Sequence, residues 1–74
     1  MADKDGIYPE VGAALVKARK EAGLTQEQLA ERSGVSRITI ARIEKAHINP
    51  SFKSLEALAH GMGRTLTISF DVKD

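Results

Sequence analysis

The chain has 74 residues, of which 42% are hydrophobic and 28% charged, and its net charge at neutral pH is +1. This length allows one small domain, and the apolar content is too high for a disordered segment. The absence of cysteine excludes a disulfide scaffold and a thiolate zinc site, and no apolar run approaches the roughly 18 residues of a membrane helix. The charged start MADKDG lacks the hydrophobic region of a secretory signal, so we expect a cytoplasmic protein with no membrane partner.

Positive charge gathers in the middle of the chain. Between residues 32 and 53 there is one acidic residue, Glu44, and five basic ones: Arg32, Arg37, Arg42, Lys45 and Lys53. Such a stretch is compatible with phosphate binding, and on charge alone a solvated surface explains it equally well.

The first half of the chain predicts an arm and two helices. Residues 1–8 have no periodicity and are expected to be a flexible N-terminal arm. Pro9 is typical of a helix start, and apolar residues at helical spacing continue to Gly23, a typical C-cap. Thr25 and Gln28 have the spacing of a capping box, which predicts a short second helix over residues 25–33, ended by Gly34.

The stretch SRITIARIE alternates apolar and polar residues at its centre, as a strand would. Continued alternation would place Arg42 and Glu44 on the apolar face, whereas Ser36 is a good N-cap. The stretch therefore predicts a third helix, joined to the second as a helix-turn-helix. Ile40 and Ile43 are expected to face inward, which leaves Ile38 outside, between two arginines, on a face available to a partner.

The last third predicts a fourth helix and a strand. Ser51 is a further N-cap, and helical spacing of apolar residues continues to Gly61 or Gly63. TLTISFDV then alternates with period two, which is typical of a strand. A single strand leaves two edges unpaired, so we expect pairing with a second copy; the alternative is that it packs on its own domain or pairs with residues 4–8. The expected dimerisation residues are Leu66, Ile68, Phe70 and Val72.

The run GLTQEQLAERSGVSRITIARIEKAHINPSFKSLEALAHGMG resembles the lambda-repressor-like, XRE-type helix-turn-helix family. It fits the family pattern TQxxLAxxxGVSxxTIxxxE, then NPS and LxxLA, and the likeness covers about residues 10–63. The resemblance implies a mainly α fold, a four- to five-helix bundle, to which the sequence adds one C-terminal β-strand. We expect a DNA-binding domain over residues 9–63 and a dimerisation strand over residues 64–74.

The resemblance also implies roles for single residues. Arg37, Ile38 and Arg42 would meet base edges in the major groove. Arg19 and Glu44 would form a structural ion pair. The full set of expected DNA-binding residues is Gln26, Ser36, Arg37, Ile38, Thr39, Arg42, Lys45 and Asn49. Two positions depart from the family: Ala46 stands where glycine often closes the third helix, and His47 where lysine is frequent.

These features predict a sequence-specific repressor that binds a palindromic operator in double-stranded DNA as a homodimer. A short domain of this type with a terminal strand resembles antitoxins of the HigA/HipB type, which implies a toxin partner and autoregulation. The alternative is a protein-interaction module that uses the helices as a scaffold and docks a partner through the strand. The sequence has no nucleophile–base signature, phosphate loop or metal-ligand pattern, so we expect no enzyme activity, cofactor or metal.

Overall fold

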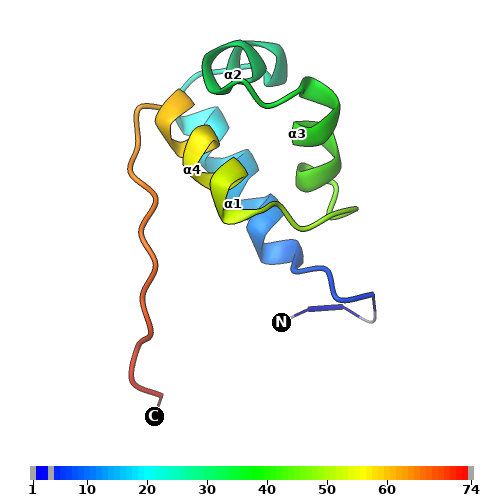
Figure 1. The fold of residues 1–74 in the computed structure, drawn as a ribbon, viewed down its shortest axis with the longest axis vertical. Coiled ribbons are helices and arrows are strands. Elements are labelled where there is room, and N and C mark those ends of the chain that lie inside the picture. The colour runs from blue at the N-terminus through cyan, green and yellow to red at the C-terminus, as the bar shows by residue number, and fades with distance from the viewer. Residues whose placement is uncertain (1, 4, 74) are drawn as a thin grey trace.

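A computed structural model describes residues 2–3 and 5–73, and Figure 1 shows its arrangement. Residues 1, 4 and 74, which belong to the expected arm and strand, lie outside the described residues. Within the described part there are four helices: α1 (Pro9–Glu21), α2 (Gln26–Ser33), α3 (Arg37–Glu44) and α4 (Phe52–Gly61). The helix α2 packs on α4 and on α3, and α1 packs on α3. No helix in this part is long and apolar enough to cross a membrane.

Three of the helices begin at side-chain caps. The Thr25 side chain accepts a hydrogen bond from the backbone N–H of Gln28, and the side-chain oxygen of Gln28 accepts one from the N–H of Thr25, so the expected capping box is present. Ser36 caps α3 and Ser51 caps α4, each accepting from the backbone N–H three residues later. The αL residue Gly34 ends α2 with φ 78°. These local signals fix where α2, α3 and α4 start, before any tertiary contact is considered.

The core lies where the helices converge. Four side chains are almost completely buried, with exposed fractions of 0% for Leu29 and Ile40 and 1% for Ile43 and Leu58. Two of them belong to α3, whose inner face packs against α1 and α2. Burying an aliphatic side chain of this size contributes about 1.5–3 kcal/mol, and the two isoleucines therefore hold α3 firmly to the body.

One glycine sets how closely α3 lies against α1. A Cβ added at Gly12 would collide with the backbone carbonyl oxygen of Ile43. Only a residue without a side chain allows this approach of the two helices. The sequence pattern did not reveal this role of Gly12.

The end of α3 departs from the family pattern in residue type but not in conformation. Ala46 has φ 59°, the left-handed conformation that glycine adopts more easily. The N–H of Ala46 donates to the carbonyl of Ile43 and that of His47 to the carbonyl of Arg42, so the helix end is closed by backbone hydrogen bonds. Alanine therefore occupies a glycine conformation here.

The prediction of a C-terminal strand was wrong. Residues 64–73, which we call the tail, contain no strand, and the backbone groups of residues 65–73 make no hydrogen bond to another segment of the described chain. Alternation shows that a chain is extended with two unlike sides, but a strand also needs a neighbouring edge to pair with. Neither residues 5–8 nor any other described segment supplies that edge, and so Leu66, Ile68, Phe70 and Val72 lie on an extended tail rather than in a sheet.

Candidate nucleic-acid interface

The outer face of α3 carries exposed basic and apolar side chains. Ile38 is 59% exposed, whereas Ile40, two residues further on, is fully buried. Arg37 and Arg42 are also exposed. One side of the helix therefore belongs to the core, and the other presents two guanidinium groups flanking an aliphatic side chain. This composition matches the base edges of a major groove, where arginine bonds guanine and an apolar group meets the thymine methyl.

The hydroxyl groups at the start of α3 are engaged with one another. Ser36 Oγ accepts from the backbone N–H of Thr39 at 3.1 Å and donates to Thr39 Oγ1 at 2.9 Å. Ser36 is exposed and Thr39 half-buried. Ser36 is thus held in place by the cap, beside the positive end of the α3 dipole, which favours an anion.

A hydrogen-bonded network connects α1, α2 and α3 beneath this face. Arg19 Nε and Nη2 donate to the two carboxylate oxygens of Glu44 at 2.7 and 3.0 Å, and Arg19 Nη1 donates to the carbonyl of Leu24 at 2.9 Å. The side chains of Arg19 and Glu44 are 12% and 7% exposed. The ion pair is bidentate and largely shielded from water, and it ties the last turn of α3 to α1.

The same carboxylate orients Gln26, the first residue of α2. Gln26 Nε2 donates to Glu44 Oε1 at 3.0 Å. An ionised carboxylate only accepts hydrogen bonds, so the amide of Gln26 must turn its NH2 group toward Glu44. The second N–H of that group remains for another acceptor, such as a phosphate oxygen. The sequence indicated the ion pair and Gln26 separately; their connection depends on the packing of α2 against α3.

This network determines the ionisation of Glu44. Burial raises the pKa of its carboxyl group, but hydrogen bonds from Arg19 and Gln26 outweigh that effect, so the pKa of Glu44 lies below its usual value of 4.5. The hydrogen bond to Glu44 in turn raises the pKa of Arg19, against a smaller lowering by burial. Both groups are therefore charged at neutral pH, and the Glu44 carboxylate accepts the hydrogen bond from Gln26 in that state.

Glu27 is a neighbour of this face that sequence reasoning missed. Its Oε2 lies 4.0 Å from Arg37 Nε, and both side chains are well exposed, at 72% and 48%. An exposed pair at this distance is weak, so Arg37 is free to exchange Glu27 for a nucleic-acid acceptor. The sequence separation of ten residues gave no signal for this contact.

The two remaining predicted residues lie beyond the end of α3. Lys45 is the exposed C-cap residue of α3. Asn49 Oδ1 accepts from the N–H of Tyr8 at 2.9 Å, and its Nδ2 donates to the carbonyl of Gly6 at 2.8 Å. Asn49 thus holds the end of the N-terminal arm against the loop before α4. One N–H of its amide group remains for another acceptor.

Comparison with known proteins places this arrangement in a family. The model of the helix-turn-helix family HTH_3 matches residues 15–68. An uncharacterised HTH-type transcriptional regulator of Methanothermobacter thermautotrophicus is 52% identical over 46 residues, which are 62% of this chain and 67% of that protein. The immunity repressor protein of Bacillus phage phi105 is 47% identical over 53 residues, or 72% of this chain. The chain spans only 37% of the length of that repressor.

Solved structures agree with the sequence comparison. The wild-type restriction-modification controller protein C.Esp1396I superimposes with a TM-score of 0.74 at 37% identity, covering 77% of this chain and 74% of that one. The same controller protein has been solved as a tetramer in complex with its natural operator of 35 base pairs, and that structure matches with a TM-score of 0.73. The chain described here belongs to the helix-turn-helix family of transcriptional regulators, a DNA-binding class without enzymatic activity.

Proposed function

We propose that this protein is a sequence-specific repressor that reads its operator with the outer face of α3. The observation that carries the proposal is the division of that helix: Ile40 and Ile43 are buried, while Arg37, Ile38 and Arg42 are exposed. In this assignment Arg37 and Arg42 bond base edges or phosphates, and Ile38 meets a thymine methyl group. The similarity to a phage immunity repressor supports the regulatory role.

Phosphate contacts come from residues around this face. Gln26 offers the amide N–H that Glu44 leaves free, and Ser36 and Thr39 lie at the start of α3, where the backbone of DNA would pass. Lys45 adds a point charge at the other end of the helix. Asn49 offers one amide N–H, because its other polar groups hold the N-terminal arm. Such contacts set the position of the protein on DNA without reading sequence.

The test compares one arginine variant and one lysine variant for their binding to the operator and to unrelated DNA. Arg37→Ala should weaken operator binding by about 1–3 kcal/mol, roughly 5- to 150-fold, and relax the sequence preference. Lys45→Ala should weaken binding to both DNAs equally and reduce the slope of log K against log salt by about one. Fluorescence anisotropy titrations at several salt concentrations measure both effects, and Lys17→Ala on α1 is the control. Unchanged sequence preference in Arg37→Ala would show that this residue reads no base.

We further propose that the repressor acts as a homodimer on a palindromic operator, with Leu66, Ile68, Phe70 and Val72 contributing to the contact between copies. The exposure of the apolar tail supports this, as does the assembly of the similar controller protein on its operator as a tetramer. Two recognition helices about 34 Å apart would then meet successive major grooves. Light scattering over a dilution series measures the mass; a monomer at all concentrations would refute the dimer.

The finer role that we propose is that of an antitoxin which binds a toxin and represses its own operon. Its support is the exposed apolar tail, a surface suited to a second protein. The same tail is the observation that favours the alternative, an interaction module without specific DNA binding. Gel shifts on DNA upstream of the gene separate the two, because the module would give no salt-dependent, sequence-selective retardation. Copurification with the product of an adjacent gene tests the antitoxin role.

A further inference from the structure

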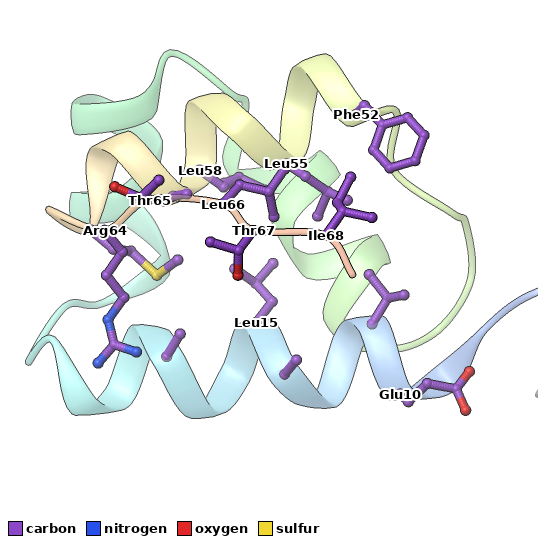
Figure 2. A pocket seen from close by; sticks show the side chains of 15 residues that line it. Glu10, Leu15, Phe52, Leu55, Leu58, Arg64, Thr65, Leu66, Thr67 and Ile68 are labelled. Atoms are coloured by element: carbon purple, nitrogen blue, oxygen red, sulfur yellow. The ribbon is translucent and has the colours of Figure 1, made fainter. Parts of the chain in front are cut away.

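An apolar groove runs along the body between α1 and α4. Its volume is about 480 Å³, and its walls include Val11 and Ala14 from α1 and Phe52 and Leu55 from α4. Figure 2 shows the first part of the tail crossing this groove, with Leu66 near Leu55 and Leu58 and with Ile68 toward Phe52. The groove lies away from α3, which Figure 1 shows on the opposite side of α1 and α4 from the tail.

The tail is anchored at its start. The N–H of Arg64 donates to the carbonyl of Ala59 at 2.8 Å, and the guanidinium group of Arg64 donates to Glu21 Oε1 at the end of α1 at 3.2 Å. From this point the tail returns along α4 toward the start of that helix (Figure 2). The backbone hydrogen bond of Arg64 therefore sets where the tail starts on the groove, and the exposed Arg64–Glu21 ion pair adds little.

Exposure rises steeply along one side of the tail. Leu66 is half-buried, Ile68 is 61% exposed, and Phe70 and Val72 are 99% and 93% exposed. The period-two alternation places these four residues on the same side of the extended tail, whereas Asp71 and Lys73 fall on the other side. Leu66 and Ile68 thus line the groove of their own chain, whereas Phe70 and Val72 are almost fully exposed in the described part of the chain.

Phe70 cannot reach the groove of its own chain while the start of the tail is anchored. An extended chain advances about 3.3 Å per residue, so Phe70 lies about 7 Å beyond Ile68, which is already near Phe52 at the end of the groove. Figure 1 shows the tail running on past the helices. To cover Phe70 within the same chain, Leu66 and Ile68 would have to leave their places.

We infer that Phe70 and Val72 of one copy pack into the groove of a second copy, beside Phe52 and Leu55. The inference rests on the proposed homodimer and names both sides of its interface. The rim residue Phe52 is 70% exposed and lines the same groove as Ile68, and a two-fold axis beside Phe52 would bring each tail over the other groove. The end of the tail and the groove are both apolar, and both belong to this chain, as an isologous contact requires. The contact is made by side chains and needs no strand pairing.

The chain contains no cysteine, so single cysteines report this contact directly. Phe52→Cys and Phe70→Cys, mixed and oxidised, should give a disulfide-linked heterodimer as the main product. Lys17→Cys mixed with Phe70→Cys is the control and should give much less of the mixed product. If the Phe52→Cys, Phe70→Cys double variant instead closes a disulfide within one chain, or if the mixture gives no more heterodimer than the control, the inference is wrong.

A second experiment measures the contribution of the tail to dimerisation. Phe70→Ala combined with Val72→Ala should raise the dimer dissociation constant at least about 100-fold in dilution light scattering, with unchanged helical circular dichroism. A dimer unaffected by this change would overturn the inference and leave the homodimer itself standing. A wild-type chain that is monomeric at all concentrations would refute the homodimer, and this inference with it. Titrations with DNA that carries one half-site would still test whether α3 reads the bases.

Discussion

The helix α3 and the tail expose isoleucines to nearly the same extent, 59% for Ile38 and 61% for Ile68, yet they are held in different ways. The opposite face of α3 carries Ile40 and Ile43, both buried, so the conformation of the helix is independent of what binds its outer face. The tail has no buried opposite face; beyond Leu66 its apolar row is its only means of attachment. The fold of α3 thus holds Ile38 at the surface, whereas Phe70 and Val72 at the end of the tail are almost fully exposed and no buried face fixes their position.

The largest expected effect on the free energy of unfolding distinguishes substitutions on the two faces of α3. Ile40→Ala should lower the free energy of unfolding by about 2–5 kcal/mol, because it leaves a cavity at a fully buried site. Ile38→Ala should change it by less than about 0.5 kcal/mol and weaken operator binding instead. Urea unfolding and operator titrations of both variants measure this. A stability loss of similar size for Ile38→Ala would mean that its side chain belongs to the core.

The attachment of α3 to α1 should weaken in acid. Because the pKa of Glu44 is lowered in the folded state, its charge stabilises the fold above its usual value of 4.5, and this stabilisation is lost as the pH falls through the lowered pKa. Thermal unfolding between pH 7 and pH 3 should show this loss. Glu44→Gln should cost about 2 kcal/mol at pH 7, because Arg19 loses its charged partner, and should flatten the pH dependence below 4.5. An equally steep acid dependence in Glu44→Gln would assign the effect to other carboxylates.

A smaller effect of opposite sign is expected at the end of α3. Ala46→Gly should raise the free energy of unfolding by about 1 kcal/mol, because the left-handed conformation at φ 59° costs alanine more than glycine. Ala13→Gly, at an exposed position within α1, is the control and should destabilise by about 1 kcal/mol. Urea unfolding measures both. Destabilisation by Ala46→Gly would mean that Ala46 does not adopt this conformation in solution.

The smallest effect on the fold itself should be found at the end of the tail. At concentrations where the chain is monomeric, Phe70→Ala should change the free energy of unfolding by less than about 0.5 kcal/mol, because its side chain is 99% exposed. Leu66→Ala should cost about 1 kcal/mol, since that side chain is half-buried against the groove. Equal losses for both variants would show that the whole tail packs on its own chain.

The two stretches with alternating apolar residues show how far sequence reasoning reached. In SRITIARIE the cap at Ser36 and the charges at Arg42 and Glu44 contradicted a strand, and the helix prediction agrees with the structure. In TLTISFDV nothing local contradicted a strand, and that prediction was wrong. Whether an extended chain becomes a strand depends on a partner edge, which is not a local property.

The sequence alone determined the starts of three helices, the turn at Gly34 and the inward isoleucines, because caps, αL glycine and helical spacing act within a few residues. Tertiary structure decided the contacts between distant residues. Packing of α2 on α3 brought Gln26 to Glu44, and the loop before α4 brought Asn49 to the N-terminal arm. The end of α4 set where the tail begins and which groove it crosses. These features depend on how the helices lie in space, and the local sequence pattern does not determine that.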